Sequence, residues 1–84
     1  MIDARQQALT AHGWHLRARL EYLNTSQAEF VRQLNERKKV SGAAVCRWMN
    51  GRSYPSRDLL PVVLDVLQYS LAERVQYVRL WAGV

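Results

Sequence analysis

The chain has 84 residues, the size of one domain, and 49% of them are hydrophobic, which is enough for a buried core. It has no run of about 18 apolar residues that could span a membrane and no charged-then-apolar start of the signal-peptide kind, so we expect a cytoplasmic protein. The single cysteine, Cys46, cannot form an internal disulfide, which agrees with a reducing compartment.

The net charge of +5 is concentrated in one segment. Between Arg32 and Arg57 there are seven Lys and Arg residues against one acidic residue, Glu36, a net charge of +6. The other five basic residues are outnumbered by six acidic ones. A local excess of positive charge attracts a polyanion, and the commonest polyanion in a cytoplasm is nucleic acid.

Residues 3–23 are predicted to form one long helix that Asp3 caps and Asn24 ends. Its Gly13 costs about 1 kcal/mol relative to Ala, so a break near His12–Gly13 is an alternative. One face has a seven-residue repeat and should meet the core; it carries Ile2, Leu9, Gly13, Leu16, Leu20 and Leu23. The opposite side is also apolar, and either the C-terminal helix or another subunit should cover it. That side carries Ala4, Ala11, Trp14, Ala18 and Tyr22.

A short second helix is predicted to begin at Ser26, because Ser26 and Glu29 have the spacing of a capping box. Its apolar stripe consists of Phe30, Val31 and Leu34. If this helix continued to Lys38, the ammonium group would lie on the apolar face, which is costly without a partner. Residues 35–39 are therefore interpreted as a frayed helix end and an enlarged basic turn.

A third helix is predicted between Ser41, a good N-cap, and Gly51, which can adopt the left-handed conformation that stops a helix. Its docking side is apolar and consists of Val45, Trp48 and Met49. Its outward side carries Ala43, Arg47 and Asn50. A helix that is only solvated usually carries several long charged side chains there, so this outward side leaves room for a flat surface to approach.

Two short capped helices joined by a polar turn and followed by the segment NGRSYPS resemble the helix-turn-helix of the phage-repressor (Cro/CI, or XRE) family. The residues that carry this resemblance are Ser26, Gln27, Phe30, Leu34, Val40, Ser41, Val45, Trp48, Asn50, Gly51, Pro55 and Ser56. The connection between Leu34 and Ser41 is longer than the family's usual one. The expected fold is thus all-α, a compact bundle of about five helices that contains a helix-turn-helix (26–51) with an enlarged turn.

The resemblance implies that the third helix lies in the major groove of double-stranded DNA. There Arg47 can make a bidentate contact with guanine, and alanine methyls can touch a thymine methyl. The expected base contacts are Gly42, Ala43, Ala44 and Arg47. Because small residues stand where relatives often carry polar base readers, some specificity should come from the turn or from DNA shape. The expected backbone contacts are Gln27, Lys38, Lys39, Ser41, Asn50, Arg52, Ser53, Tyr54 and Arg57. The alternative is a solvated face on an all-helical interaction domain.

The fourth helix is predicted over 58–68. A start at Ser56 would place Pro61 beyond the first turn, at a cost of about 3 kcal/mol, whereas a start at Asp58 keeps it within that turn. The side chains expected to be buried from it are Leu59, Leu60, Val63, Leu64 and Leu67. Ser70 and Glu73 form a second capping box that opens a last helix over 70–82. The dimer interface expected on that helix consists of Leu71, Val75, Tyr77, Val78 and Trp81.

Other chemistry is weakly supported. His12 and His15 are three residues apart and could share a metal with Cys46, but no further ligand has metal-site spacing. Cys46 paired with a histidine as a nucleophile lacks an oxyanion-hole loop. Phe30, Trp48 and Tyr69 are interpreted as core residues.

We therefore expect no enzyme activity, no cofactor and no metal. The predicted function is a sequence-specific DNA-binding transcriptional regulator, a repressor that acts as a homodimer on a pseudo-palindromic operator. The alternative is a protein-interaction module, antitoxin-like or a phage accessory protein, that binds a partner through its C-terminal helix.

Overall fold

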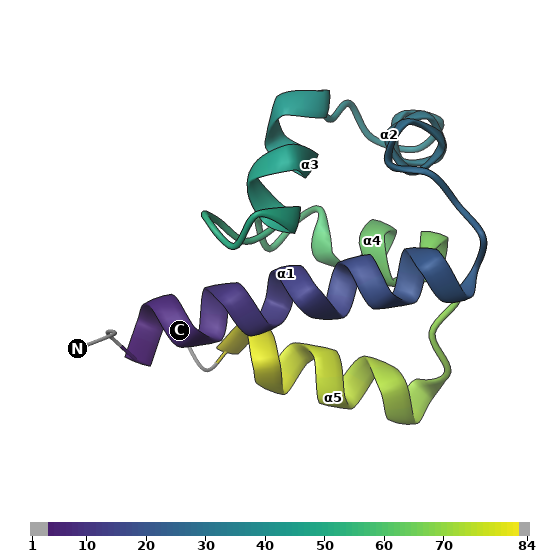
Figure 1. Cartoon of the computed structure of the whole chain (residues 1–84). Helices are drawn as coiled ribbons and strands as arrows, with labels where there is room; N and C mark the ends of the chain where they lie inside the picture. Colours follow the sequence, from purple (N-terminus) through teal and green to yellow (C-terminus); the bar gives the residue numbers. More distant parts are fainter. Residues whose placement is uncertain (1–3, 83–84) are drawn as a thin grey trace.

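The computed structural model describes residues 4–82, with side chains up to Arg79, and this part of the chain contains five helices and no strand. The helices are α1 (Ala4–Tyr22), α2 (Gln27–Asn35), α3 (Gly42–Met49), α4 (Leu60–Val66) and α5 (Leu71–Ala82) (Figure 1). The predicted all-α fold is confirmed. The expected cap at Asp3, the apolar Ile2 and the side chain of Trp81 lie outside this description. None of the described helices is long and apolar enough to cross a membrane.

Helix α1 runs through the middle of the molecule, between α5 on one side and α2 and α3 on the other (Figure 1). It is continuous, so the alternative of a break near His12–Gly13 is wrong. Its buried residues are Leu9, His12, Gly13, Leu16 and Leu20. They belong to the predicted core face except for His12, and Leu23 of that face is only half-buried. Asn24 adopts the left-handed conformation at φ 53°, as predicted for the residue that ends this helix.

The caps that the sequence predicts for α2 and α3 are present. The Ser26 Oγ accepts from the Glu29 N–H at 3.1 Å, and the Ser41 Oγ accepts from the Ala44 N–H at 3.1 Å. At the other end of α3, Gly51 has φ 69°, which is the left-handed conformation expected of it. These local rules therefore fix where both short helices begin and where α3 ends.

The turn between α2 and α3 is more ordered than predicted, so the interpretation of 35–39 as a frayed end is wrong at its first residue. Helix α2 stays regular to Asn35, whose side chain then spans the turn. Its Nδ2 donates to the carbonyls of Val31 and Val40 at 2.8 and 2.7 Å, and its Oδ1 accepts from the Val40 N–H at 3.1 Å. One amide side chain thus joins the end of α2 to the residue before the α3 cap.

Helix α4 begins at Leu60, two residues later than predicted. The N–H groups of Leu59 and Leu60 both donate to the Ser56 carbonyl, at 3.0 and 3.1 Å, so the preceding residues form turns rather than a helix. Pro61 lies in the first turn of α4, as expected, where its missing N–H costs no helical hydrogen bond. The helix ends at Val66 instead of residue 68, because Gln68 is in the left-handed conformation at φ 59°.

The second capping box, at the start of α5, has both of its reciprocal hydrogen bonds. The Ser70 N–H donates to the Glu73 Oε1 at 3.0 Å, and the Glu73 N–H donates to the Ser70 Oγ at 3.3 Å. The box predicted at the start of α2 forms only in one direction, since the Glu29 carboxylate accepts from Arg32 and Gln33 instead.

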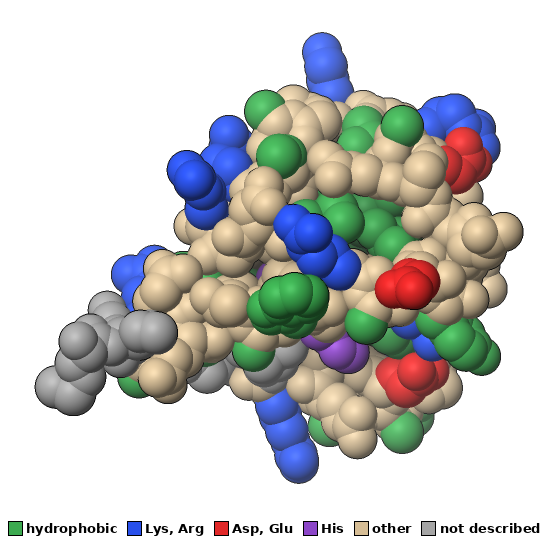
Figure 2. Space-filling view, viewed as in Figure 1, with side chains coloured by type: hydrophobic (Ala, Val, Ile, Leu, Met, Phe, Trp, Pro, Cys, Tyr) green, Lys and Arg blue, Asp and Glu red, His purple; other side chains and the backbone are tan. Residues whose placement is uncertain are grey.

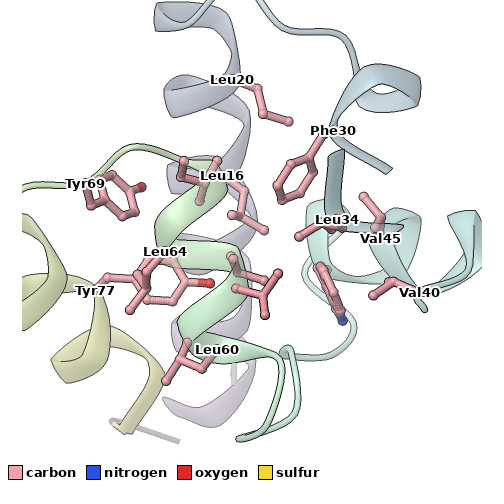
Figure 3. Packing of buried hydrophobic residues seen from close by; sticks show 14 residues of the cluster. Leu16, Leu20, Phe30, Leu34, Val40, Val45, Leu60, Leu64, Tyr69 and Tyr77 are labelled. Carbon is pink, nitrogen blue, oxygen red and sulfur yellow. The ribbon is translucent and has the colours of Figure 1, made fainter. Parts of the chain in front are cut away.

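The core lies between α1, α2, α3 and α4, and Tyr77 of α5 belongs to the same cluster. Figure 3 shows side chains from separate helices converging there, among them Leu16, Leu20, Phe30, Leu34, Val45 and Leu64. Phe30, Trp48 and Tyr69 are buried, as predicted. Val62 is buried although the sequence analysis did not select it, and Leu59 is only half-buried.

The second apolar side of α1 is not covered by α5, so the first of its two expected partners is wrong and coverage by another subunit stays a prediction. Trp14 and Tyr22 on this side are 68% and 77% exposed. Helix α5 packs instead on a neighbouring side of α1, where Tyr77 contacts His12 and Glu73 pairs with Arg19.

Candidate nucleic-acid interface

The outward face of α3 has the orientation that the sequence predicts. Val45 and Trp48 are 0% and 3% exposed, whereas Ala43 and Arg47 on the other side are exposed. A Cβ built on Gly42 would meet nothing within 4 Å, so the start of α3 is open. We call Gly42, Ala43, Ala44 and Arg47 the α3 face; Ala44 is half-buried against the core, and the other three residues are exposed. Its N-terminal end carries only small residues, and Arg47 is its single long cation.

The N-terminus of α3 offers hydrogen-bond donors. The Ser41 Oγ accepts from Ala44, and the Ser41 carbonyl accepts from Val45 at 3.3 Å. Within the described part of the chain, the N–H groups of Gly42 and Ala43 have no acceptor. Together with the partial positive charge of a helix N-terminus, such groups favour an anion. Gln27 is exposed at the corresponding position in α2.

The positive charge of 32–57 is partly neutralised within the fold. Arg32 binds the carboxylates of Glu29 and Glu36 on α2. The Arg37 Nη1 donates to the Asp65 Oδ2 at 2.6 Å, and this contact, with a second one from Arg74, lowers the pKa of Asp65.

Lys38 is also engaged within the chain. Its Nζ lies 3.9 Å from the Asp58 Oδ2 and donates to the Asp58 carbonyl at 3.3 Å. The predicted backbone contact Lys38 thus already has an acidic neighbour. Four cations of the segment have no ion pair within the described residues, and these are Lys39, Arg47, Arg52 and Arg57.

Charge is distributed unevenly over the surface. In the view of Figure 2, the Asp and Glu side chains lie over α2 and over the adjoining ends of α1 and α5. The edge that holds α3 and the loop after it shows Lys and Arg side chains with no acidic neighbour. Of the unpaired cations, Arg47 belongs to the α3 face, and Lys39, Arg52 and Arg57 lie in the segments that precede and follow α3 in the chain.

The loop after α3, residues 51–57, rests on α1. A Cβ on Gly51 would lie 3.0 Å from the Thr10 Cα, and the Gln6 Nε2 donates to the Gly51 carbonyl at 3.2 Å. From this support the loop presents Arg52 and Arg57, both exposed, and Ser53, which is half-buried.

Tyr54 does not have the predicted role of a backbone contact. Its hydroxyl is buried without a hydrogen-bond partner in the described part of the protein, and its ring centroid lies 4.6 Å from that of His12. Burial raises the pKa of this phenol. The prediction is wrong for the hydroxyl, which is buried, while the half-buried ring packs on His12 of α1.

Asn50 ends α3 with the help of Arg17, a residue that the sequence analysis missed. The Arg17 Nη2 donates to the Asn50 Oδ1 at 2.7 Å, and its Nε donates to the Met49 carbonyl at 2.9 Å. The Asn50 Nδ2 contacts the Cys46 Sγ at 3.2 Å. Asn50 is predicted to contact a phosphate, but both polar atoms of its side chain, Oδ1 and Nδ2, already have partners within the chain. No local pattern marks Arg17, since its partners lie more than 30 residues away in the chain.

A second missed feature is a buried group of histidine and tyrosine side chains. The Tyr77 Oη lies 2.5 Å from the His12 Nε2, and the Tyr69 Oη lies 2.5 Å from the His15 Nε2. His12 and Tyr77 are both 0% exposed. Burial, aided by the neighbouring His15, lowers the pKa of His12 to about 4, so it is neutral at pH 7.

This burial removes Tyr77 from the expected dimer interface. The prediction is wrong for this residue because its ring belongs to the contact between α1 and α5 of the same chain. Leu71, Val75 and Val78 are 80%, 47% and 38% exposed. We call these three residues the α5 stripe.

Among the described residues, no three His, Cys, Asp or Glu side chains are grouped so that they could hold a metal ion. The chain matches no protein-family model, no curated protein and no solved structure. The functional proposal therefore depends on the α3 face and on the charges near it.

Proposed function

We propose that the protein is a sequence-specific double-stranded DNA-binding regulator of transcription that inserts α3 into the major groove. The observation that carries this proposal is the α3 face, which has small side chains and Arg47 and is flanked in the chain by the unpaired cations Lys39, Arg52 and Arg57. An α-helix fits the major groove of B-form DNA, and an arginine there can contact the O6 and N7 of guanine together.

In this proposal α2, the turn and α3 act as a helix-turn-helix with an enlarged turn, like that of the phage-repressor family. The N-termini of α2 and α3 are suited to phosphates, because their first N–H groups and helix dipoles favour an anion. The backbone contacts that remain after the corrections above are Gln27, Lys39, Ser41, Arg52, Ser53 and Arg57, with Lys38 available if its ion pair opens.

We further propose that the protein acts in the cytoplasm as a homodimeric repressor, through occlusion of its operator. The α5 stripe is an exposed apolar surface on a small chain, which a second copy would cover. Two copies would place their α3 helices in successive major grooves, about one DNA turn apart on a pseudo-palindromic site.

A second candidate is a protein-interaction module that uses the α5 stripe for a different partner. The exposed Leu71, at 80%, and Trp14, at 68%, favour this candidate, because large apolar side chains are common in interfaces. One protein could have both functions. A measurement of DNA binding tests the first function without testing the second.

The deciding experiment is selection of duplexes from a random DNA pool with the purified protein at moderate salt, where purely electrostatic binding is weak. We expect enrichment of an inverted repeat with half-sites about 10 base pairs apart. If the folded protein enriches no sequence, the protein-interaction module becomes the better proposal.

Arg47→Ala then tests the proposed base contact. We expect a loss of about 1–3 kcal/mol of specific affinity, with any protein partner still bound. Arg79→Ala is the matched control, because it removes an equal charge from an exposed position on α5, across α1 from α3 (Figure 1). Equal losses for both variants on a single half-site would contradict a specific role for Arg47.

A further inference from the structure

The loop that carries Arg52 and Ser53 is held from inside the protein. Of the residues that follow them, Pro55 is fully buried and Tyr54 packs its ring on His12, with 4.6 Å between centroids and 54° between planes. The exposed Arg52 and the half-buried Ser53 are thus placed by inward-facing neighbours. The orientation of the His12 ring sets the surface on which this part of the loop rests.

The His12 ring is in turn held by α5. Its Nε2 lies 2.5 Å from the Tyr77 Oη, and the two rings meet edge to face, with 5.2 Å between centroids. Both side chains are fully buried, and the His12 Nδ1 has no partner within the described residues. The contact with Tyr77 is therefore the one polar contact described for this imidazole.

We propose that His12 and Tyr77 are positioning residues for the loop: docking of α5 orients the His12 ring and so fixes Tyr54 and the neighbouring Arg52 and Ser53. The path runs from α5 through α1 to the loop, and each step is a direct contact. This inference rests on the proposed function, since it gives the loop a role in DNA binding. It makes the helix that carries the α5 stripe a determinant of the DNA-facing surface.

The chain contains a matched control for this inference. Tyr69 and His15 form the same type of hydrogen bond, also 2.5 Å long, across the same side of α1. The rings that His15 contacts are those of Tyr69 and Tyr77, whereas Tyr54 packs on His12. Removal of either tyrosine hydroxyl should thus lower stability by a similar amount. Only removal of the Tyr77 hydroxyl should change the conformation of the loop.

The experiment compares Tyr77→Phe with Tyr69→Phe, which keep both rings and remove one hydroxyl each. Two readouts are needed: the backbone amide NMR shifts of Arg52 and Ser53 without DNA, and the affinity for a labelled duplex that carries one selected half-site. We expect Tyr77→Phe to move both amide signals and to weaken binding several-fold. Tyr69→Phe should leave both readouts unchanged.

Other outcomes overturn the inference. Unmoved loop signals in Tyr77→Phe, equal effects in the two variants, or moved signals with unchanged affinity would each show that α5 does not position the loop for DNA. If the wild-type protein binds no DNA, the proposed function fails, and the NMR comparison still decides whether Tyr77 positions the loop.

A third variant covers the case in which Tyr77→Phe does not fold. His12→Gln keeps a polar nitrogen near Tyr77 and removes the ring on which Tyr54 packs. We expect it to move the Arg52 and Ser53 signals, and unmoved signals would contradict the proposed path.

Discussion

Gly13 of α1 and Met49 of α3 are in direct backbone contact, since a Cβ on Gly13 would lie 2.8 Å from the Met49 carbonyl oxygen. One turn further along α1, the Arg17 Nε donates to the same carbonyl at 2.9 Å. The C-terminal end of α3 therefore rests on α1 at a point where only glycine fits. Because that contact sets the direction of α3, it also sets the direction of the α3 face.

We predict that Gly13→Ala destabilises the protein by about 1–3 kcal/mol, because the added methyl meets backbone and forces the two helices apart. Helix propensity alone would favour Ala by about 1 kcal/mol at this position, so the sign of the effect tests the contact. Urea unfolding measures it.

Gly42→Ala is the control for this prediction. No atom lies within 4 Å of the added Cβ, so we expect unchanged or slightly raised stability, by about 0.4–1 kcal/mol. A Gly13→Ala variant as stable as the wild type would show that α1 and α3 are not in backbone contact.

The sequence predicts these helices well but misjudges Gly13 for a physical reason. Helix propensity and caps are local properties, so Ser26, Ser41 and Gly51 could be assigned from their neighbours alone. Gly13 was selected as a weak point of α1, where a break was an alternative. Its actual role is to admit the backbone of α3, a contact between residues far apart in the chain, which no periodicity encodes.

The same limit explains the errors at Tyr54 and Tyr77. The sequence predicts both at the surface, Tyr54 as a DNA backbone contact and Tyr77 as part of the dimer interface. Each instead contacts His12, for which the sequence analysis predicts no place in the core. Periodicity cannot show which of two sides of the last helix packs against the rest of the chain. The partner of Tyr77 is His12, which lies 65 residues away in the chain.

We predict that Asn35→Ala lowers stability by about 1–3 kcal/mol and loosens the turn before α3. The variant removes the side chain that donates to Val31 and Val40 and accepts from the Val40 N–H, which leaves half-buried backbone groups unsatisfied. Hydrogen exchange of the Val40 amide should become faster, and urea unfolding gives the loss of stability.

Gln33→Ala on the same helix is the control for Asn35. Its amide contacts the Glu29 side chain, so we expect a change within about 0.5 kcal/mol. Equal effects of the two variants, or an unchanged Val40 exchange rate in Asn35→Ala, would mean that the turn does not depend on the Asn35 side chain.

We predict that stability falls by about 2 kcal/mol between pH 7 and pH 5, mainly because of His12. Burial lowers the pKa of His12 from 6.5 to about 4, so over this range the unfolded chain binds a proton that the folded protein does not. Stability is therefore present above pH 6.5 and is lost as the pH falls toward 4. The lowered pKa of His15 acts in the same direction.

Urea unfolding at the two pH values measures this loss, and His12→Gln provides the comparison. The variant lacks the titrating group, so its stability should change much less over the same range. An equally steep fall in the variant would assign the pH dependence to other groups.

The last prediction concerns the salt dependence of DNA binding at Lys38 and Lys39, which the sequence treats as equivalent. A cation that neutralises one phosphate adds about one unit to the slope of log K against log salt concentration. Lys39 has no ion pair within the described residues, so we expect Lys39→Ala to flatten the slope by about one unit. Lys38 lies 3.9 Å from the Asp58 carboxylate, and its removal also leaves that carboxylate uncompensated. We therefore expect Lys38→Ala to flatten the slope less than Lys39→Ala does. Equal slopes for the two variants would contradict this prediction. They would mean that the exposed Lys38–Asp58 pair opens when DNA binds, at little cost in stability.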